Sequence, residues 1–291
     1  MARPKAKSDI VFDVIIYIIC ILLIIICLVP ILHVAARSLS SADALIKGKV
    51  VLRPVGLNTD AYKTIFKDPV YTRALGWTAI LTVIATACSI FMTVLCAYPL
   101  IFKELKGRKF INGFIILTMY LNAGTIPNYL LMKDLNLIGH PLVLILPGVL
   151  SVFNMIIMRS FFNGIPASIR ESAEIDGAGY GHILLNIYLP LSKPVLATLT
   201  LFYAVGRWNG FSDALMYMND RRWYPIQLVL YNILNNVPSI EVATQEGFSS
   251  PGLSETLRAA SIMIATIPIL IVYPFLQKYF IAGATLGAVK E

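Results

Sequence analysis

One polar stretch, residues 170–194, interrupts the membrane-length apolar runs and holds Glu171, Asp176 and Gly177 at fixed offsets. Glu171 and Asp176 are the carboxylates that acid–base chemistry or a docking contact would use, and Gly177 follows at once. So polar a segment cannot lie in hydrocarbon, where unpaired polar groups have no water to bind. We therefore expect a loop that faces water or another protein and acts as a docking element.

Short helices are expected to position these side chains. Ser168 is predicted as a helix N-cap with Glu171 three residues later, a capping-box spacing. This places Glu171, Glu174 and Asp176 near the helix start, where each negative charge is favourable by roughly 0.3–1 kcal/mol. Gly177 and Gly179 are predicted to end the helix, because glycine tolerates the left-handed backbone of a C-cap.

A second amphipathic helix is predicted after these glycines. Ile183, Leu184 and Ile187 fall on one of its faces, and we expect it to stop before Pro190. An ordinary helical hairpin that covers its own membrane spans would show the same local pattern.

A second polar group interrupts an apolar run. Ionisable residues in a span usually face a cavity or another protein segment, so Arg207, Trp208 and Asn209 are candidates for a substrate path. Trp208 would stack on a ring of the substrate and Asn209 would bind its hydroxyls; packing between subunits, or snorkelling of Arg207, is the alternative. Arg207 and Asp213 are six residues apart, so we expect each to need other partners.

Three further polar residues in an earlier run have the same two interpretations, a substrate path or buried helix–helix hydrogen bonding. They are Asn122, Thr125 and Tyr129.

Catalytic and cofactor chemistry finds no support in the sequence. There is no HExxH pattern, paired carboxylate or nucleophile elbow, and the three histidines are scattered singly. The four cysteines lie in apolar runs without metal-ligand spacing. A phosphate-binding G-x-x-x-x-G-K-[ST] loop is also missing, so energy from ATP would have to come from a partner. We expect no catalytic residue, metal or bound cofactor.

The composition is that of a membrane protein. Hydrophobic residues make up 57% of 291 positions and charged residues 14%, against about 25% charged in soluble domains. The 24 basic residues outnumber the 16 acidic ones. No basic patch is interleaved with aromatic residues, so nucleic-acid binding is not expected.

Six apolar runs are long enough to cross a bilayer, which predicts an all-α fold of six transmembrane helices. We expect a tail at 1–13, a membrane domain at 14–282 with its docking loop at 165–194, and a second tail at 283–291. The runs are Val14–Leu32, Ala74–Phe102, Phe110–Met132, Pro141–Met158, Val195–Met218 and Ala259–Leu276.

Charge distribution predicts the orientation. Four basic residues in the seven positions 103–109, and three in the amino-terminal tail, favour the cytoplasmic side for both. An even number of spans then places both termini in the cytoplasm, with the docking loop. The segment 37–73 holds seven basic residues yet would lie outside, where we expect it to be partly folded.

The docking loop resembles the signature loop of ABC-importer permeases, which reads E-A-A, then D-G-A, then a spaced I-x-L-P. Ser172 replaces the usual alanine and Leu184 stands where an aromatic residue is common. The positions that meet the pattern are Glu171, Ala173, Asp176, Gly177, Ala178, Ile187, Leu189 and Pro190.

Three further segments resemble the maltose-type carbohydrate permeases of the complex-oligosaccharide subgroup, so the resemblance covers nearly the whole chain. These are G-T-I-P-N-Y-L-L from Gly124, W-N-G-F from Trp208 and Q-K-Y-F-I-A-G-A-T-L-G-A-V-K from Gln277.

The resemblance implies a type I ABC-importer permease in a bacterial plasma membrane, whose loop forms a coupling helix against an ATP-hydrolysing subunit. It implies a second permease, two ATPase subunits that hold ATP and magnesium, and an external sugar-binding protein. It also makes the carboxy-terminal tail a second ATPase contact, through Gly283, Gly287 and Lys290. The coupling residues would be Glu171, Ser172, Ala173, Asp176, Gly177, Ala178 and Leu184.

Other functions stay open beside oligosaccharide import. A permease of the same family for another small polar solute would share these motifs. An ion-coupled carrier would need a carboxylate near the membrane midplane, for which Asp213 is the candidate. The sequence does not identify the sugar, the subunit that makes the main substrate contacts, or whether the ATPase is shared.

Overall fold

The computed structural model describes residues 7–235 and 251–288, which contain helices, turns and loops and no strand. By its contacts the chain forms two compact units, Met1–Thr72 with Leu230–Thr266, and Arg73–Val229 with Ile267–Glu291. The α-helices are α1 (Lys7–Ser38), α2 (Ala42–Ile46), α3 (Asp60–Lys67), α4 (Pro69–Ala97), α5 (Arg108–Tyr120), α6 (Thr125–Asp134), α7 (Val152–Gly164), α8 (Ala167–Ile175), α9 (Tyr180–Ile183), α10 (Leu189–Leu191), α11 (Lys193–Asn209), α12 (Ser212–Tyr217), α13 (Ile226–Leu234) and α14 (Pro251–Ala288). Shorter turns are η1 (Pro99–Ile101), η2 (Pro141–Leu144), η3 (Leu146–Gly148), the π-helical η4 (Leu184–Tyr188) and η5 (Arg221–Trp223).

The membrane-length segments agree with the predicted count of six. Three helices are long and apolar enough to cross a membrane, and three bent helix pairs also qualify if each pair is one span. The single helices are Val11–Ser38, Pro69–Ile101 and Glu255–Val272. The bent pairs are Arg108–Tyr120 with Thr125–Asp134, Pro141–Gly148 with Val152–Gly164, and Tyr180–Leu191 with Lys193–Asn209.

The sharpest of these bends, 115°, interrupts the predicted run 110–132. Asn122 accepts a hydrogen bond from the Gly124 N–H through Oδ1, at 2.9 Å, and so closes a turn outside the helix. Gly124 has φ of +89°, a backbone that glycine takes without steric cost. The apolar run therefore forms two short helices, α5 and α6, and not one straight span.

Two boundaries near the docking loop differ from the prediction. The second helix does not stop before Pro190, because α9, η4 and α10 follow one another through that proline. Pro190 lies at the first positions of α10, where its missing N–H costs least. At the other end, α11 stops at Asn209, and α12 begins only at Ser212, so the run 195–218 is broken.

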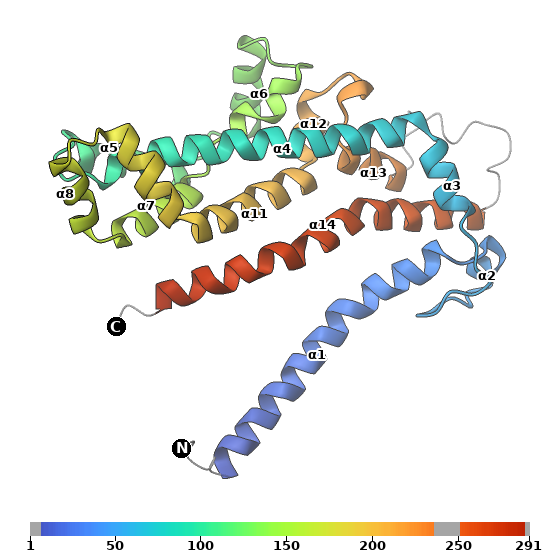
Figure 1. The fold of residues 1–291 in the computed structure, drawn as a ribbon. Helices are drawn as coiled ribbons and strands as arrows, with labels where there is room; N and C mark the ends of the chain where they lie inside the picture. The colour runs from blue at the N-terminus through green and yellow to red at the C-terminus, as the bar shows by residue number, and fades with distance from the viewer. Residues whose placement is uncertain (1–6, 236–250, 289–291) are drawn as a thin grey trace. The chain divides into compact units, whose positions relative to one another are not determined.

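The core of the second unit, residues 73–229 with 267–291, lies at one end of α4. Tyr98 makes edge-to-face ring contacts with Phe162 of α7 and Tyr188 of η4, with centroids 6.2 and 5.4 Å apart. All three rings are buried, among Met155, Met158, Ile183 and Leu199. This cluster joins α4, α7, α9 and α11 close to α8, at the end where Figure 1 shows α5, α7 and α8.

The first unit, Met1–Thr72 with Leu230–Thr266, contains the segment that follows the first span. The segment is partly helical, as predicted, through α2 and α3. Ser40 ties it to α1: its Oγ donates to the Ala36 carbonyl at 2.6 Å and accepts from the Val55 N–H at 3.0 Å. Within the same unit, Arg37 forms an ion pair with Glu255.

The predicted tail contacts at Gly283 and Gly287 lie in a helix. Helix α14 continues to Ala288, so Gly283 and Gly287 lie in its last turns rather than in a flexible strand. Lys290 lies outside the described residues.

Candidate functional site

The docking helix α8 begins two residues earlier than the capping-box prediction placed it. Pro166 occupies the N-cap position and makes no side-chain cap, while Ser168 lies inside the helix. The Ser168 carbonyl accepts from the Ser172 hydroxyl at 2.9 Å. The prediction of Ser168 as N-cap is therefore wrong: the Pro166 backbone, fixed in an extended conformation, sets the helix start.

The acidic residues also lie elsewhere on α8 than predicted. No acidic residue falls in the first turn; Glu174 lies near the end and Asp176 is the C-cap. Negative charge there opposes the helix dipole, so it needs another partner. Arg170 supplies one for Glu174, with Nε 3.5 Å from Oε1.

The end of α8 is a Schellman turn that uses the predicted glycine. The Ala178 N–H donates to the Ala173 carbonyl at 2.9 Å, and the Gly177 N–H donates to the Glu174 carbonyl at 3.1 Å. Gly177 has φ of +81°. Gly179, which was also predicted to take the left-handed form, instead has φ of −74° and is the N-cap of α9.

One basic side chain links α8 to the end of α4. The Arg170 guanidinium carbon lies 5.1 Å from the centroid of the Phe102 ring, a cation–π contact. Phe102 in turn contacts the Tyr180 ring edge to face at 5.2 Å, and the Tyr98 hydroxyl donates to the Tyr180 carbonyl at 3.0 Å. These contacts tie α8 and the start of α9 to the core.

The loop has an inner and an outer face. Ile183 is fully buried, and Leu184 and Ile187 pack against the same core, as the amphipathic pattern predicted. Glu171 and Ser172 are exposed. A hollow of about 440 Å³ lies beside the Schellman turn, lined by Ala173, Asp176, Gly177, Ala178, Gly179, His182 and Ile187.

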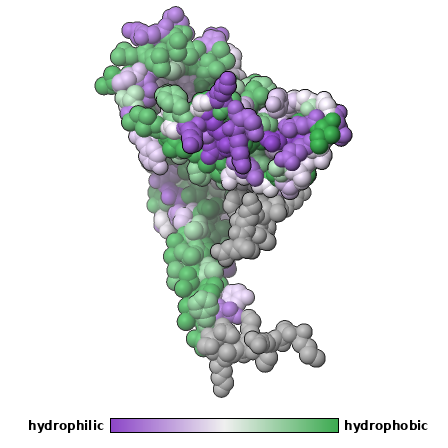
Figure 2. Space-filling view, turned by 90° about the vertical axis from the view of Figure 1, so that its left-hand side faces the viewer, coloured by the Kyte–Doolittle hydropathy of each residue, from purple (hydrophilic) through white to green (hydrophobic). Residues whose placement is uncertain are grey.

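Hydrophilic residues gather on this end of the second unit. Figure 2 looks at the side on which α8 and α5 lie in Figure 1, and shows a polar patch framed by hydrophobic surface. Exposed charged side chains come from both α8 and the neighbouring loop: Lys103, Glu104, Lys106, Lys109, Glu171, Glu174 and Asp176. The predicted docking helix and the basic loop therefore share one polar end.

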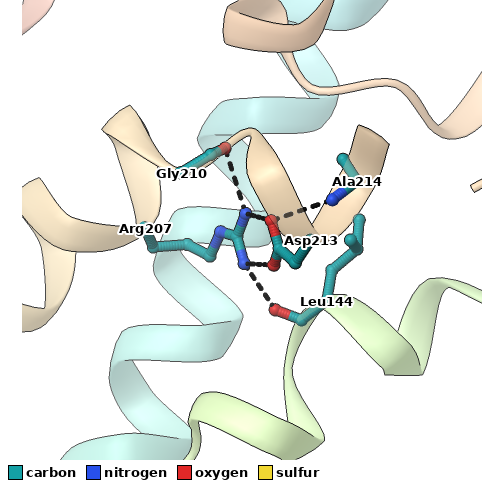
Figure 3. Close-up of polar contacts among 5 residues, drawn as sticks. All are labelled: Leu144, Arg207, Gly210, Asp213 and Ala214. Carbon is teal, nitrogen blue, oxygen red and sulfur yellow. Dashed lines mark hydrogen bonds and ion pairs between the residues drawn. The ribbon is translucent and has the colours of Figure 1, made fainter. Parts of the chain in front are cut away.

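The second candidate site centres on Arg207, near the end of α11. Its Nη1 lies 2.5 Å from Asp213 Oδ2 and its Nη2 lies 3.1 Å from Oδ1 (Figure 3). The expectation that the two residues need other partners is wrong, because α11 ends between them and the chain folds back. Arg207 also donates to the Leu144 and Gly210 carbonyls, at 2.8 and 3.1 Å.

A cavity of about 340 Å³ adjoins Arg207 in the second unit. It lies where the span containing η3 and α7 is interrupted, between Gly148 and Val152. Its lining residues come from α4, from the segment that runs from η2 to the start of α7, and from α11: Ala85, Ser89, Leu144, Ile145, Gly148, Ser151, Asn154, Phe202, Tyr203, Gly206 and Arg207.

Of the residues predicted for a substrate path, Arg207 lines this cavity and the others do not. Asn209 is exposed, and its side-chain amide donates to the Val205 carbonyl of its own helix at 3.0 Å. Trp208 is half-buried. Tyr129 stacks on Tyr217 with centroids 6.0 Å apart.

Asn122 and Thr125 lie at the bend between α5 and α6, where both are exposed. Asn122 is used in the turn that closes this bend.

The sequence prediction missed four polar residues of the cavity, Ser89, Ser151, Asn154 and Tyr203. They come from three different apolar runs, two of them from the run 141–158, so no single spacing pattern connects all four. Their shared signal, a hydrogen-bonding side chain inside a membrane-length segment, is weak for neutral residues.

Comparison with known proteins decides the family. Residues 89–286 match the model of the family described as "Binding-protein-dependent transport system inner membrane component". The matched region contains the docking loop and all the residues that line the cavity except Ala85. The chain belongs to this family.

Two curated relatives from Bacillus subtilis (strain 168) are similar to this permease over most of their length. The polygalacturonan/rhamnogalacturonan transport system permease protein YtcP is 40% identical over 280 residues, covering 96% of this chain and 98% of YtcP. Protein LplC is also 40% identical, over 265 residues, covering 90% of this chain and 89% of LplC.

A solved structure confirms the fold of the permease. One chain of a bacterial ABC transporter involved in the import of the acidic polysaccharide alginate superposes with a TM-score of 0.89 at 33% identity, covering 96% of this chain and all of that chain. The predicted all-α permease fold is therefore correct.

Proposed function

We propose that this permease is a subunit of an ATP-driven importer that moves oligosaccharides across a bacterial plasma membrane. A cargo of this class is supported by the descriptions of YtcP and of the alginate importer, to which the chain is similar over nearly its whole length. The cargo would arrive on an external binding protein, in keeping with the family's description. A second permease subunit and two ATPase subunits would complete the complex.

The observation that carries the mechanism is the attachment of α8. The helix exposes Glu171 and Ser172 on one side, and on the other its Arg170 lies over Phe102 at the end of α4. A force applied by an ATPase subunit to the exposed side would reach the membrane span through this contact, as a rigid-body movement. The hollow beside Gly177 would receive a side chain of that partner.

Charge favours the cytoplasm for the α8 end. The loop 103–109 lies at the same polar end, and its four basic residues are expected on the inner side of the membrane. By this assignment both termini are cytoplasmic, and Gly283, Gly287 and Lys290 would supply the second ATPase contact.

The experiment is to purify the whole importer, reconstitute it in proteoliposomes and measure oligosaccharide uptake and ATP hydrolysis together. Glu171→Lys reverses a charge on the exposed side of α8, so we expect uptake and binding-protein-stimulated hydrolysis to fall at least tenfold. Asp134→Lys makes the same charge change on α6, at another exposed position, and serves as the matched control.

The cargo class and the docking role of α8 are tested by different outcomes. Wild-type complex that hydrolyses ATP but takes up no oligosaccharide would refute the cargo class. Glu171→Lys complex that assembles and transports as well as the Asp134→Lys control would refute the docking role of α8.

A further inference from the structure

The cavity beside Arg207 lies at a break in a membrane-length segment. Residues 149–151 lie outside any helix, between η3 and α7. Irregular backbone at membrane depth is tolerated where it is buried in protein or lines a cavity. Interrupted helices of this kind also line substrate sites in transporters of other folds. The break therefore marks the cavity as a place where a polar molecule can contact the protein.

Two buried polar side chains on the cavity wall lack a hydrogen-bond partner in the described part of the chain. Asn154 is 5% exposed and Ser89 is 4% exposed. Both line the cavity. Unlike the shielded Arg207 Nε, their side-chain polar atoms still reach the cavity space, and polar groups so placed usually bind water or a ligand.

The other polar groups of the cavity wall already take part in hydrogen bonds. The Tyr203 hydroxyl is 2.7 Å from Thr93 Oγ1 and accepts from the Ser151 N–H at 3.1 Å. Ser151 Oγ accepts from the Asn154 N–H at 3.4 Å. These bonds fix the wall around the Asn154 side chain and leave its amide for a guest molecule.

The cavity is not built to bind a negative charge. Arg207 is its cation, and both terminal nitrogens of the guanidinium bind the Asp213 carboxylate (Figure 3). The remaining Nε is buried without a partner. A carboxylate of a ligand would have to displace Asp213, whereas hydroxyl groups would find Asn154 and Ser89 free.

Size and surface fit a single sugar ring. The cavity, about 340 Å³, falls at the lower end of the roughly 300–1,000 Å³ typical of small-molecule sites. Phe202, Leu144 and Ile145 supply apolar surface beside the two polar groups. A mainly apolar wall with a few placed polar groups is the usual composition of such a site.

We infer that this cavity is a sugar subsite within the permease, which binds one pyranose unit of the passing oligosaccharide through its hydroxyl groups, by Asn154 and Ser89. The inference rests on the proposed function as an oligosaccharide importer. It places a substrate contact on this subunit, on residues that differ from the predicted Trp208 and Asn209.

The test uses the complete importer in proteoliposomes, with radiolabelled neutral and uronate-containing oligosaccharides. Asn154→Leu keeps the side-chain size and removes the amide that would bind a hydroxyl group. We expect sugar transported per ATP hydrolysed to fall at least tenfold for both kinds of sugar, because both carry hydroxyls, while stimulated ATP hydrolysis stays within twofold of wild type. Phe153→Leu, at a 57% exposed neighbouring position on α7, is the matched control.

Three further variants keep the test decisive if Asn154→Leu folds poorly. Asn154→Gln retains the amide and should keep more transport than Asn154→Leu. Ala85→Trp fills the cavity from α4 and should block transport, whereas Val83→Trp, at a 69% exposed position of the same helix, should not.

The outcomes separate the subsite from the proposed function. Folded Asn154→Leu and Ala85→Trp complexes that move as much sugar per ATP as wild type would overturn the subsite alone. A loss confined to uronate-containing sugars would contradict binding through hydroxyls. Wild-type complex that moves neither sugar would refute the importer function itself.

Discussion

Arg207 and Asp213 form a two-point ion pair across the break between α11 and α12, with their side chains 12% and 29% exposed. The pair holds the end of α11 to the Leu144 carbonyl and thereby shapes the cavity wall. An arginine that sequence reasoning assigned to substrate thus has a structural role in the wall of a candidate substrate site.

Removing one member of this pair should destabilise the permease. Asp213→Ala leaves the Arg207 charge buried and uncompensated. The loss in free energy of unfolding should be smaller than the ~3–5 kcal/mol found for fully buried pairs, because Asp213 is partly exposed. The measurement is the thermal midpoint of the detergent-purified importer. The double variant Arg207→Met with Asp213→Leu should recover part of the loss, and equal midpoints for Asp213→Ala and wild type would contradict this role.

Acid should weaken a second, exposed pair in a predictable pH range. Side-chain and backbone hydrogen bonds from Arg222 hold the pKa of Asp220 below its usual value. A lowered pKa in the folded state means that the contribution to stability is present above the unfolded pKa of about 3.9 and is lost as the pH falls through the lower folded value. The measurement is the difference in thermal midpoint between wild type and Asp220→Asn. This difference should be constant from pH 5 to 8 and vanish in stronger acid. A difference that changes between pH 6 and 8 would contradict the prediction.

The Arg170–Phe102 contact should couple ATP hydrolysis to transport. Phe102→Ala removes the ring under the guanidinium and its contact with Tyr180, so α8 would move without the end of α4. We expect sugar moved per ATP to fall severalfold while hydrolysis continues. Phe114→Ala, on an exposed α5 position, is the control; parallel losses of hydrolysis and uptake in Phe102→Ala would indicate a folding defect instead.

Gly177 offers a test of backbone conformation alone. A Cβ there would meet no atom within 4 Å, yet φ is +81°, so Gly177→Ala should cost about 1–2 kcal/mol through the left-handed backbone. Gly181→Ala, in helical α9 with equally open space, should be neutral or slightly stabilising. Thermal midpoints of the two variants compare them directly; a larger loss for Gly181→Ala would show that the Schellman turn is not what requires glycine.

The apolar runs and the docking loop were predictable because each leaves a strong local signal. Long apolar stretches, five of the six without charge, marked the membrane segments, and Gly177 ended α8 as its position indicated. The breaks in these segments were harder to predict, since the turn at Asn122 and Gly124 lies within a run that has no charged residue. The remaining wrong predictions concern the ends of helices. Pro166 takes the N-cap position expected for Ser168, and because α11 ends at Asn209, Arg207 can reach Asp213. The cavity was not predictable, because it joins single residues from distant segments.

The most direct test of the docking role of α8 is a crosslink from its exposed face. Ser172→Cys would be introduced into the importer after its native cysteines, Cys20, Cys27, Cys88 and Cys96, are replaced by alanine. We expect a short thiol crosslinker to join this position to an ATP-hydrolysing subunit, in an amount that changes with the bound nucleotide. We expect Asp134→Cys to give no such product. A functional complex in which Ser172→Cys never captures that subunit would contradict the claim that α8 receives the force of ATP hydrolysis.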